Sequence, residues 1–379
     1  MTSLRLYATP TERLEIYLRT LRSQRGQTLI ITPEILDTLW LADVLRVSKQ
    51  RLTILTSQQS KAAAWQSYTA FATGKAEVLI GTRFAAAVPA SKLAHLFIDR
   101  DEDASHYQSD MHPHYDARTI LELRAKGERV PLTILSETPR VERYPLLNPE
   151  LTNGGKVGVI VSLRDHWRSG QAGFLTTTLT DAIARALDAK KQTILFLNRK
   201  GYANLYECRD CRELTAAQSV LFCPRCHCPD LKERRPGIAR LVAEVSKLFP
   251  DARVSLLERA REGQKPLPYP GSDIIICTEV YLHWYRTRAY DEQVGCVGIV
   301  FPDPLWHKPD FRANELALTL LRGFQNIAAA KQADCIVQTA DPDSRVIRAL
   351  AGELQTFYTD ELADRRALGY PPYGNSSHY

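Results

Sequence analysis

The chain has 379 residues, of which 44% are hydrophobic and 24% charged, and it carries a formal net charge of +6. This length and apolar content predict two core-forming domains, or three. No apolar run reaches membrane-spanning length, and the start of the chain lacks the apolar core of a signal peptide, so we expect neither a membrane protein nor a secreted one. The mild positive charge permits nucleic-acid contact, but a solvated basic surface accounts for it equally well.

In the segment up to Pro139, short apolar runs alternate with amphipathic stretches. Apolar strands that alternate with helices indicate a parallel sheet covered by helices on both faces. The expected strands are Leu4–Tyr7, Thr28–Thr32, Leu52–Thr56, Val78–Gly81, Leu96–Asp99 and Leu132–Leu135. The expected helices are Glu12–Arg25, Ile35–Val47, Lys61–Thr73 and Ala117–Lys126.

The alternation breaks at Arg140–Gly155, where prolines and an Asn-Gly-Gly turn cluster, and then resumes. We therefore expect one α/β domain over residues 1–145, a linker over 146–156 and a second α/β domain over 157–379. The expected strands of the second domain are Val157–Val161, Thr193–Leu197, Val254–Leu257, Ile274–Cys277, Val297–Phe301 and Cys335–Gln338. Its expected helices are Thr178–Ala189, Ile238–Leu248, Arg312–Lys331 and Asp343–Arg366.

The cysteines indicate both a compartment and a site. Five of the eight lie between Cys208 and Cys228, and the other three, Cys277, Cys296 and Cys335, lie singly within apolar runs. This distribution is unlike a disulfide framework and indicates one metal cluster plus buried thiols in a reducing compartment. We therefore expect a cytoplasmic protein.

A cysteine-bearing insertion over residues 203–235 follows the expected strand Thr193–Leu197, and a basic glycine turn, Asn198–Tyr202, leads into it. Its two CxxC pairs, separated by eleven residues, comprise Cys208, Cys211, Cys223 and Cys226. Two CxxC pairs at this separation can bring four thiolates to one tetrahedral Zn²⁺. The alternative is four cysteines that are merely buried or surface thiols.

This junction of strand, basic turn and cysteine pairs resembles the second motor lobe of the primosomal replication-restart helicases, the PriA (primosomal protein N′) family. Further local matches follow in the family's order along nearly the whole chain. They are Thr32-Pro33-Glu34-Ile35, Gly81-Thr82-Arg83, Tyr115-Asp116-Ala117-Arg118, Leu123-Arg124-Ala125-Lys126, Ser136-x-Thr138-Pro139, Asp310-Phe311-Arg312-Ala313, Gln338-Thr339-x-x-Pro342 and Gly369-Tyr370-Pro371-Pro372-Tyr373. The resemblance implies two RecA-like lobes with a zinc-ribbon insertion in the second. It does not include the family's N-terminal 3′-end-binding and winged-helix domains or its C-terminal domain, so we expect a truncated member.

The family carries four CxxC pairs and two zinc ions, with the outer pairs sharing one site and the inner pairs the other. This chain has only two CxxC pairs, enough for one site, so the resemblance implies one zinc per chain, held by the four cysteines named above. His227 and Cys228 are poorer substitute ligands, because both crowd the turn at Cys223.

The resemblance places a Walker A phosphate loop after the strand Leu4–Tyr7, where this chain has Ala8-Thr9-Pro10-Thr11-Glu12-Arg13-Leu14. A phosphate cradle needs glycines, a Lys for the phosphate charge and a Ser or Thr for Mg²⁺. Here there is no glycine, Arg13 stands at the Lys position and Leu14 at the Thr position. The phosphate loop is therefore degenerate.

The same segment is also typical of a helix start that supplies its own capping groups. Thr9 would be the N-cap, Pro10 the first helical residue and Glu12 the third, which together form a capping box. A helix start capped by its own carboxylate offers no N–H groups to a phosphate. The alternative is an unconventional phosphate site built on Arg13.

Two further motifs depart from the family. The strand ending at Asp99 keeps the first Walker B acid, but Arg100 stands where the family has the Glu that polarises the attacking water. The acidic run Asp101–Asp103 follows, which leaves a register shift open. The segment Phe324–Ala330 aligns with the family's QVAGRAGR and lacks both finger arginines. These losses together predict no ATPase activity, so we do not expect ATP or Mg²⁺ as cofactors.

Two other clusters have open interpretations. His112 and His114 lie near Asp110 and Asp116, which suits a weak second metal site or ordinary surface polarity, and we favour the latter. A segment after Glu279 interleaves Tyr281, Trp284, Tyr285 and Tyr290 with Arg286 and Arg288. We expect an aromatic and basic loop there, which the resemblance places near the DNA track, where rings can stack on bases. Packing of an amphipathic lobe surface on the zinc insertion explains it equally well.

We therefore predict a PriA-like protein of replication restart: a DNA-associated structural or scaffold protein with an inactive ATPase site, which binds single-stranded or branched DNA or another primosome component. The candidate DNA contacts are Arg199, Lys200, Arg225, Trp284 and Arg286. One alternative is an active ATP-dependent 3′-to-5′ DNA helicase of the primosome. The other is a protein-interaction adaptor without DNA affinity.

Overall fold

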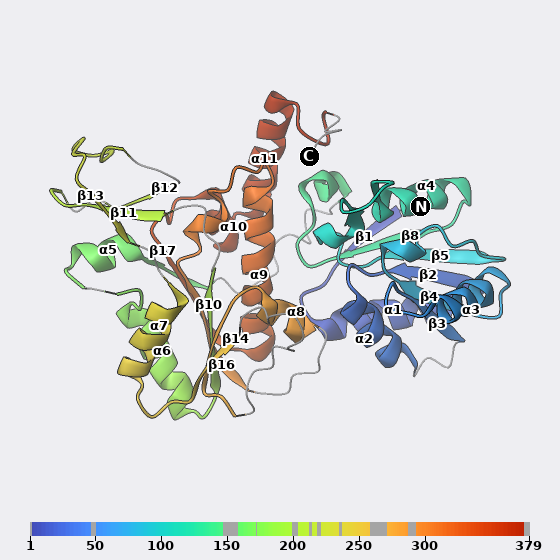
Figure 1. The fold of residues 1–379 in the computed structure, drawn as a ribbon, viewed down its shortest axis with the longest axis horizontal. Coiled ribbons are helices and arrows are strands. Elements are labelled where there is room, and N and C mark those ends of the chain that lie inside the picture. The colour runs from blue at the N-terminus through green and yellow to red at the C-terminus, as the bar shows by residue number, and fades with distance from the viewer. Residues whose placement is uncertain are drawn as a thin grey trace. The chain divides into compact units, whose positions relative to one another are not determined.

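The computed structural model describes residues 2–46, 51–146, 158–171, 173–198, 204–211, 214–217, 221–234, 237–257, 271–286 and 293–374. The chain forms two compact units. The first is Met1–Asn148 with Arg286–Ala289, and the second is Pro149–Tyr285 with Tyr290–Tyr379. Figure 1 shows a sheet covered by helices in each of them.

The first unit is built on a six-stranded parallel sheet with the order β1-β8-β5-β2-β4-β3. The strands are β1 (Thr2–Leu6), β2 (Gln27–Ile31), β3 (Leu52–Leu55), β4 (Val78–Gly81), β5 (Leu93–Ile98) and β8 (Leu132–Ser136). Helices α1 (Pro10–Ser23) and α2 (Ile35–Leu45) pack in one core cluster, and α3 (Lys61–Ala72) and α4 (Ala117–Gly127) in another. Successive residues of β2 divide between the two clusters, Leu29 and Ile31 in one and Ile30 in the other. This division explains why the successive residues Leu29, Ile30 and Ile31 are all apolar.

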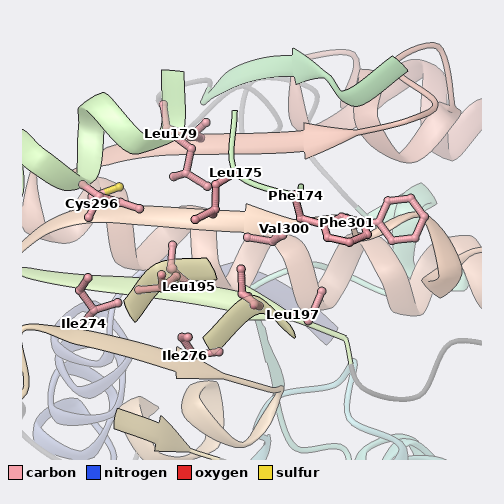
Figure 2. Packing of buried hydrophobic residues seen from close by; sticks show 14 of the residues in the cluster. Phe174, Leu175, Leu179, Leu195, Leu197, Ile274, Ile276, Cys296, Val300 and Phe301 are labelled. Carbon is pink, nitrogen blue, oxygen red and sulfur yellow. The ribbon is translucent and has the colours of Figure 1, made fainter. Parts of the chain in front are cut away.

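The second unit repeats this plan, with the strand order β14-β15-β10-β16-β17-β9. Its strands are β9 (Val159–Ser162), β10 (Gln192–Leu197), β14 (Val254–Leu257), β15 (Ile274–Cys277), β16 (Val294–Val300) and β17 (Asp334–Thr339), and all pairs are parallel. Figure 2 shows the core on one face, where Leu179 of α6 (Thr177–Asp188) packs near Leu195 and Cys296. On the other face, Phe196 of β10 stacks against Phe324 of α9 (Ala313–Lys331) with ring centroids 4.6 Å apart. The predicted α/β class with two parallel sheets is confirmed.

Three local predictions were wrong or incomplete. The single expected helix Asp343–Arg366 is two helices, α10 (Arg345–Leu350) and α11 (Leu354–Leu368), because Gly352 adopts a φ of 118°, which ends the first helix. The expected aromatic and basic loop is a helix over its first part, α8 (Val280–Arg286). Helix α7 (Ile238–Leu248) has the bounds that we expected. The hairpin β6 (Tyr107–Gln108) and β7 (Tyr115–Asp116), helix α5 (Leu163–Arg168) and several short 3₁₀ turns were not predicted.

Across the described ranges, no helix combines the length and apolarity needed to cross a bilayer. The predicted domain limits at residues 145 and 157 remain predictions.

Asp303 is a buried carboxylate just after β16. Its Oδ1 accepts hydrogen bonds from the Thr339 hydroxyl and the Ala340 N–H, both at 2.9 Å. Burial raises the pKa of Asp303 to about 7, although these hydrogen bonds lower it. The folded protein therefore holds a proton on Asp303 over a pH range in which the unfolded chain has released it.

We expect Asp303→Asn to stabilise the protein more at pH 8 than at pH 5. Because the folded pKa lies above the unfolded one, the stability contributed by Asp303 falls as pH rises from about 4 to about 7 and is then constant. Asparagine keeps the acceptor oxygen and does not ionise. Each pKa unit corresponds to about 1.4 kcal/mol, so the gain at pH 8 is on the order of a few kcal/mol. Urea denaturation at both pH values measures it, and an equal effect at pH 5 and pH 8 contradicts this account.

Candidate functional site

The start of α1 lies where the resemblance places a phosphate loop. Thr9 is the N-cap, and its hydroxyl accepts the Glu12 N–H at 3.2 Å. Pro10 opens the helix, and the Glu12 carboxylate accepts the Ala8 N–H at 2.7 Å. The predicted helix start is confirmed, with one difference: the carboxylate bonds to Ala8 rather than to the N-cap residue. A negative charge and capped N–H groups thus occupy this position.

Arg13, in the first turn of α1, points into the unit and is only 1% exposed. Its guanidinium makes a two-pronged ion pair with Asp99, through Nε to Oδ1 at 2.9 Å and through Nη2 to Oδ2. The same Nη2 donates to Asp37 Oδ1 at 3.3 Å. The Trp40 ring lies 4.8 Å from the guanidinium carbon. The basic residue at the Walker A position is therefore bound to the Walker B acid of its own chain.

Arg100 is the second cation of this site. It adopts a φ of 52°, and its Nη1 donates to Asp37 Oδ2 at 3.0 Å, while its Nη2 donates to Asp103 Oδ2 at 2.7 Å. Asp37 therefore bridges Arg13 and Arg100, with one oxygen to each. We call these five side chains the Arg13 network: Arg13, Asp37, Asp99, Arg100 and Asp103.

The pKa values show that the network is held together by charge. Burial disfavours the charged form of Arg13, but the attraction of Asp99, together with smaller contributions from Tyr7, Asp37 and Tyr17, outweighs it, so the pKa of Arg13 is raised well above its ordinary value. Arg100 behaves likewise, with Asp37 as the main stabilising charge. Burial opposes ionisation of Asp103, yet Arg100 and the Ser105 N–H lower the pKa of Asp103 to about 2. Buried charges of this kind are tolerated only when each keeps its partner.

The other two departures also have structural counterparts. Leu14, at the Thr position, is partly buried and packs against the core cluster of α1 and α2, so it brings no hydroxyl for Mg²⁺. The stretch Phe324–Ala328, at the finger position, is buried along α9. Asp37 is the residue of the network that sequence reasoning missed. The available signal was a lone acid in the otherwise apolar start of a helix, Ile35–Trp40.

The cysteines lie on a separate three-stranded antiparallel sheet with the order β12-β11-β13. Its strands are β11 (Asn204–Cys208), β12 (Leu214–Ala217) and β13 (Leu231–Arg234). Cys208 and Cys211 flank the turn after β11, and Cys223 and Cys226 lie in the turn before β13. The second unit thus carries a small cysteine-bearing sheet inserted between β10 and α7 (Figure 1).

The four predicted sulfurs lie within 4.8 Å of one another and could hold a metal ion. The closest pairs are Cys208 with Cys226 and Cys211 with Cys223, each with the sulfurs 3.5 Å apart. Tetrahedral zinc with bonds of about 2.3 Å would separate its sulfurs by about 3.8 Å, so the donor set fits. Cys228 lies outside the cluster, and its sulfur accepts the Asp230 N–H at 3.3 Å.

The candidate DNA contacts are distributed over the chain. Arg199 and Lys200 lie outside the described residues. Arg225 is exposed beside Cys223, and the Trp284 ring packs 5.6 Å from Tyr281 in α8. Arg286 is counted with the first unit, where its Nε donates to Glu137 Oε1 at 2.7 Å. A role of these residues in DNA binding remains a prediction.

The two histidines do not complete a metal site. Their rings, at His112 and His114, lie 4.2 Å apart, but the nearby Asp110 pairs with Arg83. Among the described residues, only the four cysteines bring three or more ligand atoms into metal-binding range.

The chain matches no model of a known protein family. It is 26% identical to the replication restart protein PriA of Synechocystis sp., over 97% of this chain and 51% of that protein. It is 27% identical to PriA of Thermotoga maritima, over 96% of this chain and 53% of that protein. The chain thus spans about half the length of the curated relatives it matches. RecG bound to a three-way DNA junction matches with a TM-score of 0.47 at 11% identity, over 100% of this chain and 45% of that one.

Two parallel six-stranded sheets, each covered by helices, with a cysteine-bearing insertion in the second unit, define an α/β protein of two units. The sequence matches are to replication restart proteins named PriA, to which the chain is similar along nearly its whole length.

We expect Arg13→Met to destabilise the protein by about 3–5 kcal/mol, because it leaves Asp99 buried without its main partner. The double variant Arg13→Met/Asp99→Asn removes the orphaned charge and should recover part of this loss. Urea denaturation followed by circular dichroism measures both. The matched control is Arg19→Met, an exposed arginine of the same helix, which should stay within about 0.5 kcal/mol of the wild type. Equal effects at the two arginines would refute a structural role for the ion pair.

Proposed function

We propose that the chain is a PriA-like protein of replication restart that associates with DNA as a structural or scaffold component and does not hydrolyse ATP. The observation that carries the proposal is the buried ion pair between Arg13 and Asp99. A working site needs its Lys free to reach the phosphates and its Walker B acid free for Mg²⁺. Here each of the two residues satisfies the other.

The rest of the Arg13 network supports the same conclusion. Binding a nucleotide would require Arg13 to leave a buried pair, which exposes Asp99 and Asp37 to an incoming triphosphate of the same sign. Arg100 cannot polarise a water as a carboxylate does, and it is bound to Asp37 and Asp103. The acidic residues Asp101 and Glu102 have partners of their own: Asp101 pairs with Arg143, and Glu102 accepts the Ser136 hydroxyl.

The cysteine cluster is assigned to zinc in this proposal. Four thiols that converge from two turns, with no nitrogen or carboxylate among the donors, suit a closed structural site rather than a catalytic one. Zinc would hold the two turns of the insertion together and so fix the orientation of β11 and β13. The DNA-binding residues proposed for this region, Arg199, Lys200 and Arg225, would then be presented from a rigid base.

Two alternative functions are an active helicase and a protein adaptor. An active ATP-dependent 3′-to-5′ helicase would fit the family, and an adaptor that binds only proteins would fit an inactive motor. The names of the matched relatives, replication restart proteins, favour a role at DNA over a general adaptor role. We also propose the domain limits predicted above, a cytoplasmic location, and other primosome proteins as partners.

We expect the purified protein to show no ATP hydrolysis that rises with single-stranded DNA, while it binds that DNA in the same buffer. The reason is that the phosphate loop is a capped helix start and that Arg13 is paired. A coupled ATPase assay and fluorescence anisotropy with labelled oligothymidine measure the two properties on one preparation.

The control for the ATPase assay is Arg13→Ala. Turnover that DNA stimulates in the wild type and that Arg13→Ala abolishes would establish the helicase alternative. Absence of both turnover and DNA binding would establish the adaptor alternative.

We expect about one zinc per chain by elemental analysis, lost in Cys211→Ser. The matched control is Cys228→Ser, which should keep its zinc because Cys228 lies outside the cluster. Both sheets should stay folded in Cys211→Ser, because each unit has a core of its own. Two zinc ions per chain, or equal loss in the two variants, would show that the ligand set is wrong.

A further inference from the structure

A cavity of about 270 Å³ opens in the second unit, at the edge of the sheet where its parallel strands begin. It is lined by the residues that lead into four strands, among them Lys191 and Gln192 at β10, Arg253 before β14, Asp273 before β15 and Gln293 before β16. The segment that carries the cysteine cluster follows the opposite end of β10, so the cavity is a separate site within the unit.

The charges of the cavity do not balance. Its lining has three cations, Lys190, Lys191 and Arg253, and among the described residues its only carboxylate is Asp273. Asp273 is already bound by Arg253, through the backbone N–H at 2.8 Å, Nε at 3.0 Å and Nη2 at 2.9 Å. These bonds lower the pKa of Asp273, whose carboxylate therefore stays charged and paired with Arg253. Within the described part of the chain, no carboxylate pairs with either lysine.

The backbone holds the two lysines in place. Lys190 adopts a φ of 54°, and its N–H donates to Leu187 O at 2.9 Å, at the end of α6. The next N–H, of Lys191, donates to Ala186 O at 2.8 Å. These two bonds close the helix end and turn the chain into β10. The lysine side chains therefore start from a fixed backbone, which lowers the entropy lost when they bind a ligand.

A simpler role exists for lysines at this position. Cations near a helix C-terminus interact favourably with its carbonyl groups, by about 0.3–1 kcal/mol each. That role does not account for the cavity or for Arg253, which approaches from another strand. It also makes a different prediction, namely a loss of stability with no effect on ligand binding.

We propose that this cavity binds a phosphate group of a nucleic-acid backbone. Two ammonium groups that no carboxylate of the described residues pairs with, beside the Arg253–Asp273 ion pair, surround a space of about 270 Å³, which suits a tetrahedral anion and its bound water. The cavity has no aromatic lining residue and so offers contact to phosphate rather than to bases. The choice of nucleic acid over free phosphate rests on the proposed association with DNA.

The test is fluorescence anisotropy with labelled oligothymidine at several salt concentrations. We expect Lys190→Glu/Lys191→Glu to lower the affinity at least about tenfold and to reduce the slope of log affinity against log salt by about 1.4, since each lost contact to a single strand contributes about 0.7. The matched control is Lys61→Glu/Lys75→Glu, which makes the same charge change at exposed residues of the first unit and should lower the affinity less than about threefold. If the charge reversal impairs folding, Lys190→Gln/Lys191→Gln is used with the corresponding glutamine control.

The outcomes separate this inference from the proposed function. Equal losses in the two double variants would leave DNA association intact and overturn the cavity as a phosphate site. If the wild type does not bind DNA, the proposed DNA role fails, and so does the nucleic-acid assignment of the cavity. Calorimetry with inorganic phosphate then distinguishes a free-anion site, at which binding is lost in Lys190→Glu/Lys191→Glu, from lysines that only support the end of α6.

Discussion

The buried ion pair between Arg13 and Asp99 is the interaction on which the first unit depends. It joins the first turn of α1 to the end of β5, and Asp37 extends it to α2. Three elements meet at the carboxyl edge of the sheet, and buried ion pairs therefore hold them together. An unpaired charge is very costly there, so each side chain of the network fixes the positions of its partners. Open α/β sheets bind ligands at this edge, and here side chains of the protein itself fill it.

The sheets could be predicted from the sequence because their signal is local. Strands that are buried on both faces must be apolar at successive positions, as Leu29, Ile30 and Ile31 are. In this chain such apolar runs alternate regularly with helical stretches, which is the pattern of a parallel sheet covered by helices. The ends of helices depend on single residues, and this is where the prediction failed. Gly352 adopts a conformation that ends α10, but a glycine within a helical pattern is often tolerated, so the sequence did not reveal the break.

The two candidate sites differ in how far they could be predicted. The cysteine cluster was found in full because its ligands come in pairs within a short segment, where spacing constrains geometry. The loss of the phosphate loop was visible for the same reason. What replaced it was not visible, because Arg13 and Asp99 are 86 residues apart and Arg100 and Asp37 are 63 apart. Only the folded sheet brings them together.

The balance of acidic and basic side chains gives opposite properties to two basic sites of one chain. In the Arg13 network, two guanidinium groups face three carboxylates, so the cations are fully used and an added anion would meet excess negative charge. Among the described residues that line the cavity before β10, the single carboxylate is used by Arg253, and no carboxylate pairs with either lysine. Basic residues at a family's phosphate position therefore do not by themselves indicate anion binding. What decides it is whether the fold supplies acids of its own. It does so at Arg13, and within the part of the chain that the structure describes it does not at Lys190 and Lys191.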